Sequence, residues 1–156
     1  MRLSVVCVGN KMPAWVGVGV DDYAKRLPRE LKLLWRELPL ARRGRDSKPE
    51  ILRQNEGEQI LKAIPEGDKV IALDVKGKAW STEYLAEQLQ GWQMSGDNIT
   101  LLVGGPDGLS ADCLARAGQR WSLSALTLPH PLVRVLLAEQ LYRAWTITVK
   151  HPYHRA

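Results

Sequence analysis

The chain has 156 residues, a length that suits one domain with a hydrophobic core. Its composition, 45% hydrophobic and 25% charged, is ordinary for a globular protein. No apolar run reaches the roughly 18 residues that indicate a membrane span, and residues 1–9 lack the pattern of a cleaved signal peptide. We therefore expect a single domain over residues 1–156 that works in the cytoplasm, with no membrane partner.

The net charge of +5 has one source along the chain. Between Lys25 and Arg53 there are ten Lys or Arg and four Asp or Glu, whereas the remainder has twelve against thirteen. The centre of this basic stretch is Arg42, Arg43 and Arg45. Such clustering is typical of a surface that binds a polyanion, above all nucleic acid. The alternative is a solvated loop that only aids solubility.

Strand and helix patterns alternate along the chain, which predicts an α/β fold with a mostly parallel sheet and helices on both faces. Apolar runs without polar alternation indicate strands that are buried on both sides. The predicted elements in chain order are a strand over 3–8, a helix over 13–27, a strand over 31–38, a basic loop over 39–49, a helix over 50–63, a strand over 69–74, a helix over 81–92 capped by Ser81, a strand over 98–103, a helix over 110–117 capped by Ser110, a strand over 121–126 and a helix over 132–148.

The last predicted helix is more apolar than a surface helix usually is. Its polar edge is reduced to Arg134, Glu139, Arg143 and Thr146, with Glu139 and Arg143 spaced for an i,i+4 ion pair. A helix of this kind needs an apolar partner. We expect a two-fold homodimer to supply it, because that is the commonest assembly.

Three predicted strands end in turns that suit a ligand, since ligands of parallel sheets lie beyond the carboxyl ends of the strands. These exits are Leu73-Asp74, Gly104-Gly105 and Ser124-Ala125. Gly105 lacks a Cβ, so a flat ligand can approach its backbone closely. Pro106-Asp107-Gly108, taken alone, fits an ordinary tight turn equally well.

Several familiar chemistries are missing from the sequence. It has neither G-x-x-x-x-G-K-[ST] nor G-x-G-x-x-G nor a G-x-S-x-G elbow. His151 and His154 have helix-like spacing, but Pro152 interrupts them and nothing completes a metal site. Cys7 and Cys113 form no C-x-x-C pair, which favours free thiols in a reducing compartment. The remaining possibility is a ligand held by backbone and apolar walls, which suits an adenosine-like cofactor; a Rossmann-type nucleotide enzyme is a weaker alternative.

The C-terminal tail carries positive and aromatic side chains with no acidic residue after Gln140. A frayed terminus is the ordinary interpretation of such a segment. However, unstacked RNA bases are commonly held by aromatic rings and guanidinium planes. The tail residues suited to this role are Arg143, Lys150, His151, Tyr153, His154 and Arg155.

Four segments together resemble the RlmH family, bacterial ribosomal RNA large subunit methyltransferases of the SPOUT superfamily. The segments are CVGNKMPAWV, GGPDGLS, SALTLPHPLVRVLLAEQLYRAW and the terminal HPYHR, so the resemblance spans nearly the whole chain. It implies an α/β sheet with a C-terminal trefoil knot, a feature that patterning alone would never predict. It also implies S-adenosylmethionine as cofactor and methylation of N3 of a pseudouridine in 23S ribosomal RNA on the assembled ribosome. Asp107 stands where the family leads us to expect Glu, which keeps the charge.

The resemblance also assigns expected roles to individual residues. The cofactor-binding residues would be Leu73, Gly105, Leu123, Ser124, Ala125, Leu126, Thr127 and Leu128. The catalytic candidates are Arg143 or Arg155 for charge on the carbonyl oxygens, His154 or His130 for the N3 proton, and Tyr153 for stacking on the base.

We further expect a dimer to combine the knot of one subunit with the tail of the other. Arg42, Arg43 and Arg45 would then contact RNA phosphates, and reversing their charges should weaken binding. The rival hypothesis is a ribosome- or RNA-binding module without enzymatic activity. No metal is expected.

Overall fold

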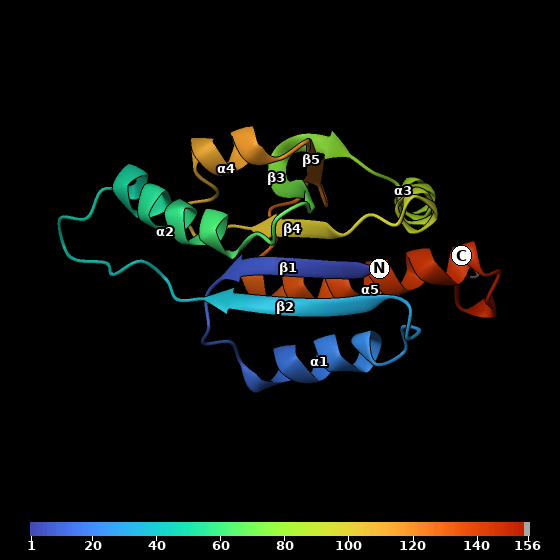
Figure 1. The fold of residues 1–156 in the computed structure, drawn as a ribbon. Coiled ribbons are helices and arrows are strands. Elements are labelled where there is room, and N and C mark those ends of the chain that lie inside the picture. The colour runs from blue at the N-terminus through green and yellow to red at the C-terminus, as the bar shows by residue number, and fades with distance from the viewer. Residues whose placement is uncertain (155–156) are drawn as a thin grey trace.

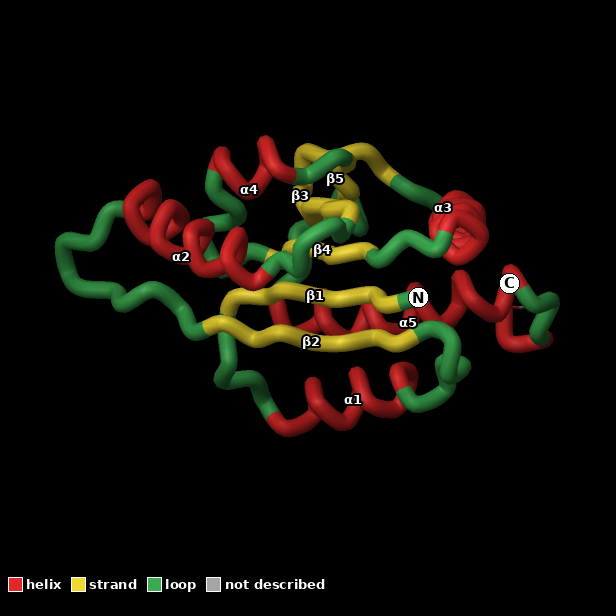
Figure 2. Tube along the Cα trace, viewed as in Figure 1, coloured by secondary structure: helices red, strands yellow, loops and turns green. Residues whose placement is uncertain are grey.

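The computed structural model describes residues 1–154, which form a parallel sheet with helices on both faces (Figures 1 and 2). This confirms the predicted α/β class. The elements are β1 (Arg2–Val8), α1 (Ala14–Ala24), β2 (Lys32–Leu38), α2 (Pro49–Ala63), β3 (Lys69–Ala79), α3 (Thr82–Ser95), β4 (Ile99–Val103), α4 (Ala111–Arg116), β5 (Gln119–Ser122), α5 (His130–Thr148) and the 3-10 turn η1 (Pro152–His154). No helix among the described residues is long and apolar enough to cross a membrane.

The sheet order is β2-β1-β4-β3-β5, and every neighbouring pair is parallel. Parallel neighbours need crossover connections, which the helices supply. Because the strands all point the same way, their carboxyl ends meet along one edge of the sheet. That edge is the position where a ligand site is expected.

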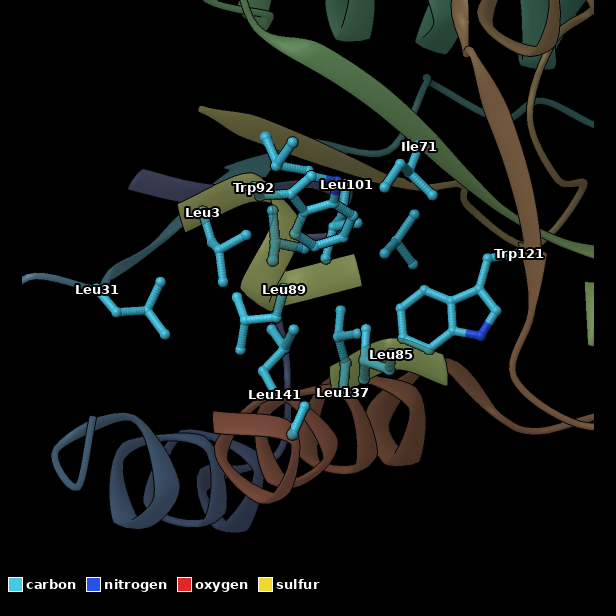
Figure 3. Close-up of a cluster of buried hydrophobic side chains, with 14 of the residues drawn as sticks. Leu3, Leu31, Ile71, Leu85, Leu89, Trp92, Leu101, Trp121, Leu137 and Leu141 are labelled. Carbon is cyan, nitrogen blue, oxygen red and sulfur yellow. The ribbon is translucent and has the colours of Figure 1, made fainter. Parts of the chain in front are cut away.

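The sheet is buried from both sides by different helices. On one face α3 and α5 contribute leucines to the larger core, which Figure 3 shows between the strands and these helices. The other face is covered by α2 and α4, with a smaller core around Val6, Ile60 and Leu102. Burial on both faces explains why the strands read as continuous apolar runs.

Two predicted helix starts are confirmed by their side-chain caps. The hydroxyl of Ser81 accepts a hydrogen bond from the backbone N–H of Tyr84 at 3.0 Å, and that of Ser110 accepts from Cys113 at 3.2 Å. Each bond satisfies an amide at a helix start that has no partner within the helix. Cys7 and Cys113 are free and buried, as expected.

Some predicted boundaries were wrong. The last strand was expected over 121–126 but spans 119–122, because the chain turns away at Leu123 to form a loop. The third strand continues past Asp74 to Ala79 after an irregularity in its pairing. The first helix ends at Ala24, and α5 begins at His130, with Pro131 in its first turn, where proline is tolerated.

The predicted polar edge of α5 was half wrong. Glu139 and Arg143 form the expected ion pair, with Arg143 Nε 2.7 Å from Glu139 Oε1. Arg134 and Thr146, however, are buried. The helix lies between α1 and α3, which cover much of its apolar surface within one chain. Leu132, with 48% of its surface exposed, remains available for a further apolar contact.

Candidate active site

A cavity of about 740 Å³ opens at the carboxyl ends of the strands. This volume lies within the range of about 300–1,000 Å³ that is usual for small-molecule sites. Its walls come from the residues that follow β1, β4 and β5, from the middle of β3 and from the start of α5. Most of the lining is apolar or backbone. The described structure therefore has a ligand-sized pocket at the predicted edge.

The Gly104–Gly108 turn forms one wall of the cavity. A side chain at Gly104 or Gly105 would collide with neighbouring atoms of the protein. A Cβ on Gly104 would stand 2.7 Å from the backbone carbon of Gly108. A Cβ on Gly105 would stand 2.9 Å from Oε1 of Glu56 and 3.2 Å from Val8. Gly105 and Gly108 pair with each other as an isolated antiparallel bridge. The glycines thus allow the turn to fold tightly against β1 and α2.

The opposite wall is a detour in β3. Leu73 and Lys78 both pair with Trp121 of β5, so residues 74–77 leave the ladder between them. Asp74, Val75 and Lys76 line the cavity from this detour. A bulge of this kind redirects a strand and is common beside active sites.

The predicted cofactor residues converge on this cavity. Leu73, Gly105, Leu123, Ser124, Leu126 and Leu128 are among its lining residues. Ala125 and Thr127 belong to the same loop but are not among them. Ser124 shapes that loop, since its hydroxyl accepts from the N–H of Leu126 at 2.9 Å and its carbonyl accepts from Ser122 at 3.1 Å. Residues from three separate segments thus surround one space.

The basic loop over 39–48 extends from the sheet as a long arm beside α2 (Figures 1 and 2). One of its arginines is engaged within the chain, because Arg43 lies 2.6 Å from Asp107 and 3.2 Å from Glu56. Arg42 and Arg45 are exposed and form no ion pair within residues 1–154. Of the three arginines predicted to contact phosphate, Arg43 is therefore paired within the chain, whereas Arg42 and Arg45 are exposed.

Two charged residues near the cavity were not among the predicted site residues. Glu56 is buried on α2, and its Oε2 accepts from the N–H of Ala41 at 3.0 Å and from Arg43, while Oε1 has no partner among the described residues. Arg53 lines the cavity and donates to the carbonyl of Asp107 at 3.2 Å. Both lie on α2 and meet groups from distant segments, which spacing along the helix does not reveal.

His130 lines the cavity at the first turn of α5. Its Nε2 accepts a hydrogen bond of 2.8 Å from Nε of Arg134, one turn further along the helix. Burial, and then the Arg134 guanidinium, lower the pKa of His130 below its usual value; hydrogen bonding to the Gly104 backbone and the charge of Glu37 oppose this. His130 is consequently neutral at pH 7.

The other catalytic candidates lie at the far end of α5. Tyr153 packs on this helix, with its ring 4.6 Å from that of Tyr142 and 4.9 Å from the Arg143 guanidinium, and its hydroxyl 3.3 Å from Glu139. Burial and Glu139 raise the pKa of Tyr153 to about 12. Nδ1 of His154 is buried and has no hydrogen-bond partner within residues 1–154. Arg155 lies outside the described residues.

The two groups of candidates are not brought together within one chain. Helix α5 has 19 residues, so its ends are about 27 Å apart at the standard rise of an α-helix. His130 stands at one end and the tail at the other, beyond the sheet in Figure 1. None of the tail residues up to His154 lines the cavity. Within the described residues, no group of His, Cys, Asp and Glu has the arrangement of a metal site.

Comparison with known proteins identifies the class of this fold and site. The family model described as "Predicted SPOUT methyltransferase" matches residues 1–154. The chain therefore belongs to the SPOUT methyltransferase family.

Curated relatives carry a more specific name. A protein of Hahella chejuensis (strain KCTC 2396) named ribosomal RNA large subunit methyltransferase H is 58% identical over 155 residues, covering 99% of each chain. A protein of the same name from Marinomonas sp. (strain MWYL1) is 58% identical over 156 residues, covering 99% of this chain and all of that one. The resemblance to the RlmH family is thus confirmed over the full chain.

A solved structure supports the fold alone. It is described as a probable methylase family protein from Haemophilus influenzae Rd KW20. It aligns with 99% of this chain and 70% of its own, with a TM-score of 0.58 and 13% sequence identity. At that identity the likeness concerns the arrangement of the backbone.

Proposed function

We propose that this protein uses S-adenosylmethionine to methylate N3 of a pseudouridine in 23S ribosomal RNA on the assembled ribosome. The observation that carries the proposal is the cavity at the carboxyl edge of the sheet, lined by six of the residues expected to hold the cofactor. The names of the relatives, which refer to the large ribosomal subunit, support the substrate class. A ribosomal substrate implies a cytoplasmic site of action.

The groups that line the cavity fit S-adenosylmethionine. Apolar walls from Leu73, Leu123 and Trp121 suit an adenine ring, and Gly105 lines the same cavity. Asp74 and Arg53 bring one charge of each sign to the cavity, which matches the ammonium and carboxylate of a methionine moiety. When bound, the cofactor supplies a methyl group on a positively charged sulfur.

The proposed reaction asks the protein to activate a weakly nucleophilic nitrogen. N3–H of the base lies between two carbonyls and must lose its proton for methyl transfer. Arg143 or Arg155 would stabilise charge on those carbonyl oxygens, and His154 or His130 would accept the proton. Tyr153 would stack on the base. Holding the base in line with the methyl group accounts for much of the expected acceleration.

We propose that a homodimer assembles the complete site. The separation of about 27 Å along α5 keeps the tail away from the cavity of its own chain, so a second subunit is needed to bring Tyr153 to it. Leu132, Leu136 and Val149 of this helix are exposed and supply apolar surface for such a contact. A mixed dimer of one cavity-deficient and one tail-deficient subunit should recover activity in one of its two sites.

We also propose that the chain has the trefoil knot of its family. The support is the family match over residues 1–154, because the knot is what membership of this family implies. Exposed Arg42 and Arg45 are proposed to contact RNA phosphates, since they carry charge on an extended loop. Arg43 is proposed to contact phosphate as well. Because it also pairs with two carboxylates of the protein, we propose that it holds the loop in place.

The direct test is methyl transfer from radiolabelled S-adenosylmethionine to intact ribosomes, to isolated large subunits and to protein-free 23S RNA. The modified nucleotide is mapped by mass spectrometry. We expect label in one pseudouridine of assembled particles and little in protein-free RNA. Label on another base or on ribosomal protein would contradict the proposal.

The alternative is an RNA-binding module without a cofactor, which the basic loop alone would also fit. Calorimetry with S-adenosylmethionine separates the two hypotheses. A methyltransferase should give saturable heat with one site per chain. Ribosome binding without any cofactor binding would favour the module.

A further inference from the structure

The least expected feature of the molecule is a buried arginine that touches three elements beside the cavity. Only 5% of the Arg134 side chain is exposed, although its sequence position suggested a solvated edge. Its Nη1 lies 2.5 Å from Oε2 of Glu37 on β2, its Nη2 donates to the carbonyl of Gly9 after β1, and its Nε donates to His130. Each guanidinium nitrogen therefore has a partner.

These contacts determine where the proton of His130 lies. A guanidinium has only donors, so Nε2 of His130 must offer its lone pair to Arg134. The imidazole proton is then on Nδ1. A second proton on Nε2 would point an N–H group at a positive charge inside the protein, which burial makes costly. The lowered pKa of His130 agrees with this geometry.

His130 and Gly104 both line the cavity, and the Gly104 backbone acts on the imidazole as a hydrogen-bond acceptor that raises its pKa. With its proton on Nδ1, the imidazole would donate to this backbone and hold the turn from α5. Glu37 and Arg134 are the charged groups that face the ring, from β2 and from the same helix.

We infer that Arg134 is a positioning residue that keeps His130 in the Nδ1–H form, so that His130 anchors the Gly104–Gly105 turn and does not accept the substrate proton. This inference rests on the proposed function for its connection to catalysis. Its geometric part, the contacts from Glu37 through Arg134 to His130, concerns the protein alone. The proton acceptor then has to come from elsewhere, and the tail is the remaining source.

The first test needs no activity and no variant. Nitrogen-15 NMR correlations distinguish the two neutral tautomers and the cation of an imidazole, and the chain has three histidines to assign. We expect His130 to be the Nδ1–H tautomer from pH 7 to pH 8. An Nε2–H tautomer, or a ring that becomes protonated within this range, would overturn the inference. An unstructured imidazole favours Nε2–H, so a disordered His130 would not imitate the expected result.

The second test measures binding of S-adenosylhomocysteine by calorimetry to Arg134→Met and Arg134→Lys. We expect Arg134→Met to weaken binding about tenfold at pH 7 and further as the pH falls, because loss of the guanidinium charge raises the pKa of His130, although burial still lowers it. Arg134→Lys, with a single donor group, should be intermediate. Arg116→Met is the control for loss of an arginine that bonds a backbone carbonyl on the other face of the sheet. Equal and pH-independent binding in all variants would overturn the inference.

The third test separates anchoring from proton transfer at His130. Asparagine retains a donor near the Nδ1 position, whereas glutamine reaches toward the Nε2 position. We expect His130→Asn to recover most of the ligand affinity lost in His130→Ala and to keep the pH profile of kcat, and His130→Gln to recover little. A fall in kcat of about 10²-fold or more in His130→Asn, with the acidic limb of the profile lost, would make His130 the base. If wild-type protein binds no S-adenosylhomocysteine, the proposed function fails while the NMR result still decides the tautomer.

Discussion

The two ends of α5 differ in how their side chains are held. At the first turn, His130 and Arg134 are fixed by β1, β2 and the Gly104 turn, in a region that the core surrounds. At the far end, Tyr153 of η1 packs on Tyr142 and Arg143 of the same helix. One end is complete within a single chain, and the other presents stacking and charged groups near its surface.

This difference separates binding of the cofactor from handling of the substrate. Pre-formed backbone walls bind a ligand without a large ordering cost. In the proposed dimer, the tail of one subunit would meet the base over the cavity of the other. Changes at the first end should alter cofactor affinity, and changes at the second should alter turnover.

The largest effect is expected for Gly104→Ala. Its Cβ would overlap the backbone of Gly108, so the turn must open, at a cost of about 1–3 kcal/mol in stability. Cofactor binding measured by calorimetry should fall below detection. The control is Gly91→Ala on α3, where no atom lies within 4 Å of the added Cβ and a gain of about 0.5–1 kcal/mol is expected. Retained affinity in Gly104→Ala would mean that the turn is not part of the cofactor site.

Removal of residues 151–156 is expected to have a large effect on turnover rather than on cofactor binding. Turnover on ribosomes should fall by about 10²-fold or more, since charge stabilisation and base stacking are lost together. Affinity for S-adenosylhomocysteine should stay within about twofold, because none of the tail residues up to His154 lines the cavity. If cofactor affinity fell in parallel with turnover, the separation between the two ends of α5 would not hold.

A moderate effect is expected from Arg42→Glu combined with Arg45→Glu. The slope of the logarithm of ribosome affinity against the logarithm of salt concentration should decrease by about 2, which corresponds to two lost phosphate contacts. The control is Arg29→Glu with Lys62→Glu, which changes net charge equally at exposed positions outside the loop. Filter binding at four salt concentrations measures the slope. Identical slopes for both variants would exclude the loop from the RNA contact.

The smallest effect concerns stability at high pH. Burial raises the pKa of Cys7 from 9.0 to about 11. A raised folded-state pKa gives stability that is present below pH 9 and is lost as the pH rises toward 11. At pH 10 the loss is about 1 kcal/mol relative to pH 8. Urea denaturation of wild type and Cys7→Ala should converge by that amount between the two pH values, and parallel curves would contradict the shift.

The sequence pattern predicted the fold correctly because both the pattern and the fold depend on which residues are buried. Apolar runs such as 99–103 and the serine caps at Ser81 and Ser110 are local signals, and the structure has them where they were expected. The end of β5 was misplaced because Leu123 and Leu126 are apolar for a different reason. They belong to a loop that lines a cavity rather than to a strand.

The polar contacts were beyond prediction because they join distant segments. Arg134 follows helical periodicity into a position that looks solvated, but its partners Gly9 and Glu37 come from strands at the other end of the chain. Glu56 is buried because Arg43 and Ala41 reach it from a loop. No spacing rule within α2 or α5 carries this information. The location of the cavity could be predicted from the carboxyl ends of the strands. The hydrogen bonds and ion pairs of Arg134 and Glu56 behind the cavity could not.

The detour in β3 has a consequence for how the protein matures. Residues 74–77 take their position beside Trp121 and Arg120, which are synthesised more than forty residues later. While β5 is still inside the ribosomal exit tunnel, residues 74–77 have no neighbouring strand to hold them, so that wall of the cavity is not yet formed. Ligand binding during translation should therefore begin only after the last strand emerges, so that premature fragments cannot sequester the methyl donor.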